Sequence, residues 1–217
     1  MEQPIIPGLD LPVRNIYCIG RNYASHAKEL GNKVPKIPLV FLKPLGTICF
    51  DGSKIELPKQ SNDVHFEAEI VLAISKSGKD ISPAKVNEHI GGVGAGIDFT
   101  ARDIQAISKK QGKPWTIAKG FDGFAPISSF TKLDPRQDLS EVDIKLFQNG
   151  FVKQHGNSSE MIFPIPNLIT FLSQLFTLHP GDLIFTGTPE GVGKVSSGDE
   201  LEVLLNNGDQ SLKVTIA

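Results

Sequence analysis

The chain has 217 residues, of which 40% are hydrophobic and 21% charged, which is typical of a globular protein with one core. Its 22 Lys and Arg residues nearly balance its 24 Asp and Glu residues, and no basic cluster is interleaved with aromatics, which argues against nucleic acid or a membrane surface as a partner. Residues 1–14 lack the features of a signal peptide, and no apolar run is long enough to span a bilayer. We expect one domain over 1–217, with 1–14 as a short lead-in, in the cytoplasm.

Short β-like segments separated by Gly and Pro make up most of the chain. Strands and helices do not alternate regularly, which disfavours a doubly wound sheet or a TIM barrel. We expect a strand-rich α+β fold, a mixed β-roll or sandwich with a few short peripheral helices. Strands are predicted in chain order over 15–20, 39–44, 65–74, 91–100, 144–150, 182–187, 201–207 and 211–217, and helices over 22–31, 101–112 and 165–176.

The first predicted helix, in "GRNYASHAKELGN", carries His26 and Glu29 three residues apart. That spacing stacks them on one helical face, where the carboxylate can orient the imidazole and raise its basicity. The pair is therefore a candidate base with its orienting partner, although a surface helix with both side chains in water explains the pattern equally well. A helix of about two turns needs packing to be stable, so it can serve as a lid.

The segment "HFEAEIVLAI", residues 65–74, places two acids at the entrance of an apolar strand. The two-residue period of a strand puts Glu67 and Glu69 on one face, roughly 7 Å apart, and an entirely apolar set on the other. Two carboxylates at this distance can share one cation. A solvated strand face is the competing interpretation, because Glu is mostly exposed in proteins.

A third acid, Asp98, follows a glycine-rich strand in "GGVGAGIDFTARD" and is its first charge. Three carboxylates form a hard, oxygen-rich site that suits Mg²⁺ or Mn²⁺, with Ca²⁺ as a substitute. Zinc is disfavoured because no His or Cys cluster accompanies the acids. Cys18 and Cys49 lie in apolar surroundings without CxxC spacing and are expected to be buried small hydrophobes.

Two further segments can serve an anionic ligand. Lys119 lies among apolar and glycine residues in "GKPWTIAKGFDGFAP", a setting in which lysine often contacts an anion or an enolate. The loop in "DLIFTGTPEGVG" offers backbone N–H groups and the Thr188 hydroxyl to a carboxylate. It lacks the pattern of a nucleotide phosphate loop, and such a loop alone is more often a simple turn.

Motifs that occur in a fixed order link these segments: E-x-E, D-x-T-A-R-D and T-G-T-P-x-G-V-G, together with "GRNYASHAKE", "FLKP", "GKPWTIAKGFDGFAPI" and "GNSSEMIFPIPNLI". With them the chain resembles the fumarylacetoacetate hydrolase family from about Asn15 to its end. It is most similar to the short single-domain members that act on acylpyruvates, oxaloacetate or related 2-oxo acids.

The resemblance implies the family's mixed β-roll, a homodimer and a role for each candidate residue. It implies that the metal ligands are Glu67, Glu69 and Asp98 and that His26 and Glu29 activate a water molecule on a lid. It also implies that the residues contacting substrate are Lys119, Gln105, Arg21 and Thr188. Two departures from the usual pattern, Lys153 before Gln154 and Lys194 in place of a common proline, would affect substrate preference if they reached the pocket.

The leading functional hypothesis is a Mg²⁺- or Mn²⁺-dependent hydrolase that cleaves a C–C bond in acylpyruvate-like 2,4-dioxo acids. The same site supports oxaloacetate decarboxylation or tautomerisation, or isomerisation and decarboxylation of 2-hydroxyhepta-2,4-diene-1,7-dioate in aromatic catabolism. A hypothesis of a different class is a non-catalytic protein that binds a 2-oxo acid.

Overall fold

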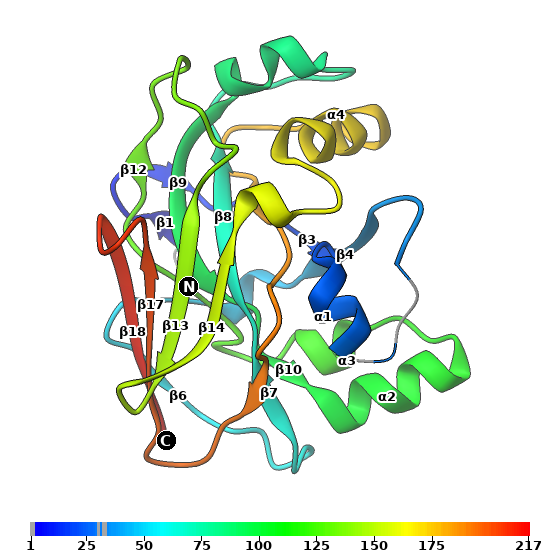
Figure 1. The fold of residues 1–217 in the computed structure, drawn as a ribbon, viewed down its shortest axis with the longest axis vertical. Helices are drawn as coiled ribbons and strands as arrows, with labels where there is room; N and C mark the ends of the chain where they lie inside the picture. Colours follow the sequence, from blue (N-terminus) through cyan, green and yellow to red (C-terminus); the bar gives the residue numbers. More distant parts are fainter. Residues whose placement is uncertain (1–2, 30, 32–33) are drawn as a thin grey trace.

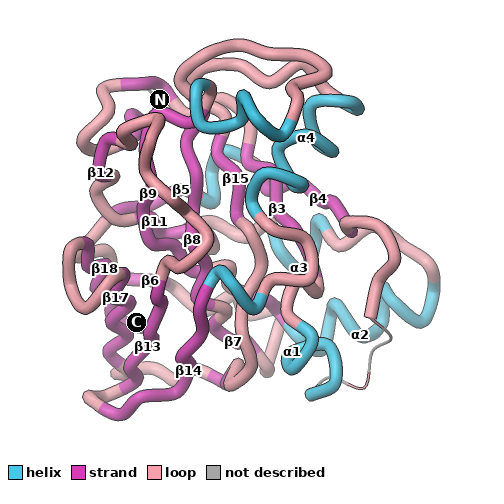
Figure 2. Tube along the Cα trace, turned by 45° about the horizontal axis from the view of Figure 1, so that its top comes forward, coloured by secondary structure: helices cyan, strands magenta, loops and turns pink. Residues whose placement is uncertain are grey.

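The computed structural model describes residues 3–29, 31 and 34–217, and it confirms a strand-rich α+β fold. The helices gather on one side of the molecule and the strands of the C-terminal half on the other (Figure 1). Figure 2 shows the same separation from a second direction. The helices are α1 (Ala24–Glu29), α2 (Arg102–Gln111), α3 (Thr116–Lys119) and α4 (Ile165–Leu175), with short 3₁₀ turns η1 (Leu45–Thr47), η2 (Pro83–Glu88) and η3 (Ser158–Glu160).

The largest sheet has eight strands and mixes parallel and antiparallel pairs, as the roll predicted from the sequence requires. Its central pair, β8 with β9, is antiparallel, whereas β15 runs parallel to β3 and β11 runs parallel to β5. In spatial order the strands are β4 (Leu39–Lys43), β3 (Ile16–Gly20), β15 (Leu183–Phe185), β8 (Ala68–Ile74), β9 (Ile90–Ile97), β11 (Ala125–Ile127) and β5 (Ile48–Phe50), and β12 (Thr131–Lys132) pairs with β9 off this path.

A five-stranded sheet and two small sheets complete the fold. The five-stranded sheet has the order β14 (Phe151–Asn157), β13 (Asp143–Gln148), β17 (Glu200–Leu205), β18 (Gln210–Ile216) and β6 (Lys54–Ile55). The small sheets are β10 (Thr100–Ala101), β7 (Val64–Phe66) and β16 (Gly193–Lys194), and β1 (Ile5–Ile6) with β2 (Leu11–Pro12).

Strand β8 is buried on both of its faces, because it lies between two hydrophobic clusters. Ile70 and Leu72 pack in the larger cluster and Val71 and Ala73 in the smaller one. The sequence-based expectation of one core face and one face reserved for acids therefore holds only at the entrance of the strand. Beyond Glu69 the second face is also core.

The predicted strand over residues 65–74 is interrupted at Glu67. The chain runs through β7 in the three-stranded sheet and then enters β8 in the large sheet, so Glu67 stands at the junction between two sheets. The period of two continues across this junction, which is why the sequence pattern looked like one strand. Of the predicted helices, α2 ends as expected at Gly112, whose left-handed φ of 64° suits glycine.

The glycines of β9 serve close packing between strands and side chains. A Cβ on Gly96 would lie 2.6 Å from the Val71 side chain and 2.7 Å from the Phe185 ring, and one on Gly94 would lie 2.8 Å from the Phe130 ring. Larger residues would therefore push β9 away from β8. The glycines of this strand thus allow the core side chains to pack closely against its backbone.

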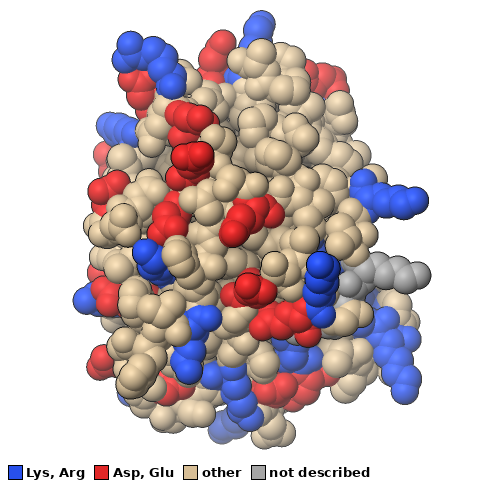
Figure 3. Space-filling view, in the orientation of Figure 1, with Lys and Arg blue, Asp and Glu red and all other residues tan. Residues whose placement is uncertain are grey.

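The surface in Figure 3 carries acidic and basic side chains interspersed, in keeping with the nearly balanced composition. Among the described residues, no helix has the length and apolar character needed to cross a membrane.

Candidate active site

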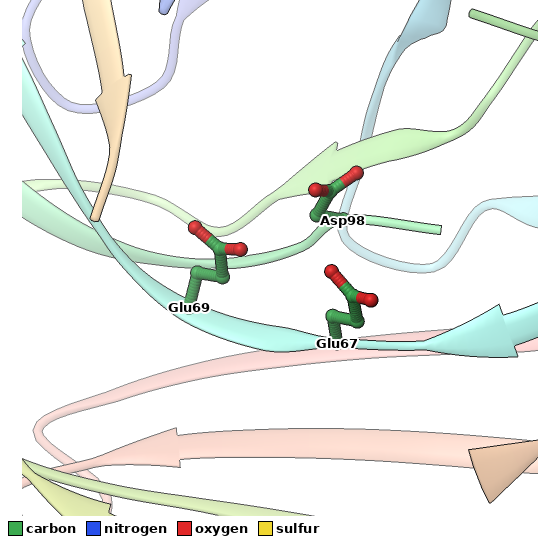
Figure 4. A group of neighbouring side chains, drawn as sticks. All are labelled: Glu67, Glu69 and Asp98. Carbon is green, nitrogen blue, oxygen red and sulfur yellow. The ribbon is translucent and has the colours of Figure 1, made fainter. Parts of the chain in front are cut away.

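Three buried carboxylates meet where β7 passes into β8 and where β9 ends. Glu67, Glu69 and Asp98 are 6%, 2% and 0% exposed, and one oxygen from each lies within 4.8 Å of the others. Figure 4 shows the three side chains turned toward a common space. The antiparallel pairing of β8 with β9 and a 2.8 Å hydrogen bond from the Asp98 N–H to the Glu67 carbonyl bring them together. The alternative of a solvated strand face is therefore wrong.

Two cationic side chains contact these acids directly. The Lys119 Nζ donates to Glu67 Oε2 at 2.8 Å and to Asp98 Oδ2, and the Arg102 Nη2 donates to Glu67 Oε1 at 2.5 Å. Burial alone would raise the pKa of Glu67, but Lys119 and Arg102 hold that pKa well below its usual range. Glu67 is therefore a carboxylate at neutral pH.

Glu69 is in a different electrostatic position. Burial, and then the neighbouring charges of Asp98 and Glu67, raise the pKa of Glu69 well above its usual range. Its Oε2 accepts a hydrogen bond from the backbone N–H of Gly187, at 2.7 Å. A cation at this point would favour the charged form of Glu69 and relieve the repulsion.

Lys43, which sequence analysis did not single out, lies beneath the cluster. It is 4% exposed, and its Nζ donates to the carbonyl oxygens of Phe99 at 3.1 Å, Lys119 at 2.6 Å and Phe124 at 2.8 Å. The Nζ also lies 2.7 Å from Asp98 Oδ1, but its three protons are directed at carbonyls, and Oδ1 is buried without a hydrogen bond. A charge inside the apolar segment "LVFLKP" was the available signal for this residue.

The carboxylate cluster fits a divalent cation. All three ligands are oxygen donors, as Mg²⁺ and Mn²⁺ prefer. Asp98 Oδ1 is a buried acceptor whose neighbour, the Lys43 Nζ at 2.7 Å, donates to carbonyls instead, and Glu69 forms no ion pair within the described part of the chain. Buried acceptors of this kind are rare unless an ion, a water molecule or a ligand completes their environment.

Helix α2 forms one wall of the cleft above the carboxylates. Arg102, Gln105 and Lys109 all line it, because positions i, i+3 and i+7 share one helical face. The Arg102 Nη1 donates to Gln105 Oε1 at 2.8 Å. Burial, and then the charges of Arg21 and Arg102, lower the pKa of Lys109. Sequence analysis found Gln105 but missed its two basic neighbours on this face.

Arg21 lines the same cleft from the segment before α1. It has a left-handed φ of 60°, which is uncommon for a residue other than glycine and often marks a functional position. Its guanidinium lies 6.0 Å from the centre of the Trp115 ring. Apolar wall residues of the cleft include Ile19, Phe41 and Trp115.

Helix α1 places His26 in the cleft and Glu29 at its outer side. His26 is 4% exposed, and its Nδ1 lies 3.3 Å from Glu29 Oε2. Glu29 is one-third exposed and accepts hydrogen bonds from the backbone N–H of Gly191. The predicted shared helical face is present, and the alternative in which both side chains face water is wrong for His26.

Thr188, at the far side of the cleft, is 2% exposed, and its Oγ1 accepts a 2.7 Å hydrogen bond from Gln154 Nε2. Lys153 and Lys194 are exposed, and neither lies among the residues that line this cleft. The Lys194 Nζ donates instead to the Asn62 carbonyl at 2.7 Å. Neither departure therefore contributes a side chain to the lining of this cleft.

The fold and the cleft define the class of protein. The family model of the fumarylacetoacetate (FAA) hydrolase C-terminal domain matches residues 15–217. The chain therefore belongs to the fumarylacetoacetate hydrolase family, and the resemblance inferred from its motifs is confirmed.

Individual relatives are similar over most of the chain. The mitochondrial oxaloacetate decarboxylase of Dictyostelium discoideum is 42% identical over 204 residues, or 94% of each protein. The mitochondrial oxaloacetate tautomerase FAHD1 of Arabidopsis thaliana is 44% identical over 186 residues, which cover 86% of this chain and 83% of that protein. The solved structure of Pseudomonas aeruginosa fumarylpyruvate hydrolase in complex with Mn²⁺ and pyruvate matches with a TM-score of 0.93 at 35% identity, covering 100% of this chain and 97% of that one. The family is thus one of enzymes acting on small organic acids.

Proposed function

We propose that the protein is a Mg²⁺- or Mn²⁺-dependent enzyme that generates the enolate of a small 2-oxo acid, with oxaloacetate as the preferred substrate. The observation that carries the proposal is the buried cluster of Glu67, Glu69 and Asp98, in which Lys119 forms ion pairs with Glu67 and Asp98 at the lining of a cleft. When bound by these three carboxylates, the divalent ion would polarise the 2-oxo group as a Lewis acid.

The residues of the chain supply binding and charge stabilisation. Lys119, whose ammonium already bridges two carboxylates, would hold negative charge as it develops on the enolate oxygen. Gln105 and Thr188, which both line the cleft, present an amide and a hydroxyl suited to the oxygens of the substrate carboxylate. Arg21 would hold the remote end of the substrate by a charge-assisted hydrogen bond.

The charge of the cleft favours a dicarboxylate. Three cations balance the charge of the three acids: Lys119 and Arg102 contact Glu67 or Asp98, and the Lys43 Nζ lies 2.7 Å from Asp98 Oδ1. A divalent ion would leave the centre with two positive charges, and Arg21 adds a positive charge at the cleft wall. Oxaloacetate carries two negative charges, whereas acetylpyruvate carries one. The two curated relatives described above also act on oxaloacetate by name.

Decarboxylation and tautomerisation need no attacking water. In decarboxylation the C3–C4 bond breaks, CO₂ leaves, and its bonding electrons form the pyruvate enolate, which then takes a proton at C3. In tautomerisation a proton moves between C3 and the 2-oxo oxygen. His26, in the cleft and next to Glu29, is placed to exchange that proton.

Hydrolysis of an acylpyruvate is the second candidate, and the His26–Glu29 pair favours it. His26 would take a proton from water as the oxygen attacks the C4 carbonyl, and the C3–C4 bond would then break to release a carboxylic acid and the pyruvate enolate. The same enolate stabilisation by Lys119 would serve both reactions.

A substrate panel tests the proposal. Oxaloacetate, acetylpyruvate, fumarylpyruvate and a hydroxymuconate would be supplied with Mg²⁺ or Mn²⁺, with enol absorbance and pyruvate formation followed separately. We expect metal-dependent turnover with the highest kcat/KM for oxaloacetate. Activity that survives exhaustive chelation would overturn the metal-dependent mechanism, and a preference for acetylpyruvate would reverse the order of the two candidates.

A further inference from the structure

Gln154 is a fully buried polar residue that connects three segments of the site without lining the cleft. It lies on β14 and is 1% exposed. Its Oε1 accepts from the Ala68 N–H at 2.9 Å, and its Nε2 donates to Thr188 Oγ1 at 2.7 Å and to the Pro189 carbonyl at 2.9 Å. Ala68 lies between the two glutamates of the carboxylate cluster.

These partners determine which end of the amide faces which segment. A backbone N–H can only donate, so Ala68 requires the oxygen of Gln154, and a carbonyl can only accept, so Pro189 requires the nitrogen. The second proton of Nε2 is then directed at Thr188. The reversed amide would place two donors together at Ala68 and two acceptors together at Pro189.

The direction of this bond determines what Thr188 can offer to a ligand. Its oxygen accepts from Gln154, so its own proton remains available. Within the described part of the chain, the Thr188 hydroxyl donates to no protein group. Since Thr188 lines the cleft, the hydroxyl proton can be directed at a ligand oxygen.

The loop that holds Thr188 is packed against β14 at further points. A Cβ on Gly156 would lie 2.6 Å from the Pro189 ring, and one on Gly191 would lie 2.1 Å from the Lys153 carbonyl oxygen. The loop is thus pressed on the strand at two points beyond Thr188. Gln154 lies between these contacts on β14 and sets the hydrogen-bond direction there.

We propose that Gln154 is a positioning residue that makes the Thr188 hydroxyl a hydrogen-bond donor to a carboxylate oxygen of the ligand. The inference rests on the proposed function, because it needs a 2-oxo acid or its planar analogue in the cleft. Gln154 itself touches no ligand and acts through Thr188.

The test is a double-mutant cycle read by ligand binding. Gln154→Glu keeps the size and the acceptor for Ala68 but replaces the donor with an acceptor, so Thr188 would turn its proton toward the introduced carboxylate. Gln154→Met removes the donor without adding charge. Oxalate, a planar analogue of the enolate, would be titrated calorimetrically into the Mn²⁺-loaded protein, with exposed Gln174→Glu on α4 as the matched control.

We expect each Gln154 variant to weaken oxalate binding by roughly 10-fold in the presence of Thr188, the scale of one hydrogen bond to a charged group. In a Thr188→Val background the same changes should cost less than about 2-fold, because no hydroxyl remains to be oriented. Thr188→Ser should retain affinity. KM for oxaloacetate should rise with little change in kcat, since the bond is made in ground and transition states alike.

Equal losses of oxalate affinity in both backgrounds would overturn the inference and indicate a structural role for Gln154. Unchanged affinity in both Gln154 variants, when Thr188→Val itself weakens binding, would also overturn it. A wild-type protein that binds Mn²⁺ but not oxalate would overturn the proposed function together with this inference. Thermal unfolding would check that each variant is folded. If one of the two Gln154 variants does not fold, the double-mutant cycle can be measured with the other.

Discussion

Glu29 accepts hydrogen bonds from the backbone N–H of Gly191 at 3.1 and 3.3 Å, 162 residues later in the chain. The same carboxylate lies 3.3 Å from the His26 Nδ1. One side chain thereby connects the short helix α1 to the loop that follows Thr188. This contact explains how a helix of less than two turns can hold a buried histidine in place.

Glu29→Gln should lower kcat for acylpyruvate hydrolysis by roughly 10- to 100-fold while leaving the free energy of unfolding nearly unchanged. The amide oxygen can still accept from Gly191, but it no longer supplies the negative charge that stabilises a protonated His26. Steady-state kinetics and urea unfolding give the two quantities. Glu141→Gln, at an exposed position, is the matched control. An unchanged kcat would remove Glu29 from the proposed mechanism.

Gly191→Ala should destabilise the protein by roughly 2–4 kcal/mol or displace the loop. Its φ is +92°, and a Cβ would lie 2.1 Å from the Lys153 carbonyl oxygen. Gly198 has a similar φ of +90° with open space around it, so Gly198→Ala measures backbone strain alone, about 1 kcal/mol. Urea unfolding of both variants checks the difference. Equal losses would mean that packing against β14 contributes nothing.

Lys43→Met should destabilise the protein by about 3–5 kcal/mol, because it removes one of the cations beside the buried Asp98 charge and leaves three carbonyls without a donor. Exposed Lys85→Met should stay within about 0.5 kcal/mol of the wild type. Chemical denaturation in the metal-free state measures both. A loss similar to that of the control would show that Asp98 is neutralised by other groups.

Glu69→Gln should abolish the rise in Tm that Mn²⁺ produces in the wild type, because one charged ligand is lost. The amide can keep the hydrogen bond from Gly187 while removing a carboxyl whose pKa burial and neighbouring acids raise. The metal-free variant should therefore be slightly more stable than the metal-free wild type, by about 2–4 °C in Tm. Thermal scans with and without Mn²⁺ check this. An intact Mn²⁺ shift would exclude Glu69 as a ligand.

Cys49 should react slowly with iodoacetamide at pH 8. Burial raises the pKa of this thiol from 9.0 to about 11, so its thiolate population is roughly 100-fold smaller than that of an ordinary cysteine. Because the folded-state pKa is raised, this thiol contributes stability that is complete below pH 9.0 and is lost as the pH rises through about 11. Mass spectrometry of labelled native and urea-unfolded protein gives the rates. Equal rates in the two states would contradict the shift.

Sequence patterns revealed the carboxylate cluster because charged residues are unusual next to apolar strands. Glu67, Glu69 and Asp98 are charges at the boundaries of apolar strands, and the two-residue period placed the first two together. The break between β7 and β8 could not be predicted, because the two-residue period continues across it. Helix α3 is too short to show helical periodicity, so it was missed.

Residues that act through distant backbone groups could not be found in this way. The carbonyl partners of Lys43 lie 56, 76 and 81 residues further along the chain. The backbone partners of Gln154, the Ala68 N–H and the Pro189 carbonyl, come from two separate segments. Such contacts depend on the tertiary fold rather than on local pattern. Arg102 and Lys109 could have been predicted, because they share a helical face with Gln105.

The balance of charge between the three buried acids and Lys43, Lys119 and Arg102, which contact Glu67 and Asp98, also bears on how the protein matures. Many metal sites built only from carboxylates hold uncompensated charge until the ion arrives, and in small metal domains binding and folding are one event. Here the polypeptide supplies its own counter-charges, so the chain can complete its fold first and acquire the ion afterwards. Metal binding would then be a reversible equilibrium of the folded protein, and the concentration of the free ion would determine the fraction of sites that are occupied.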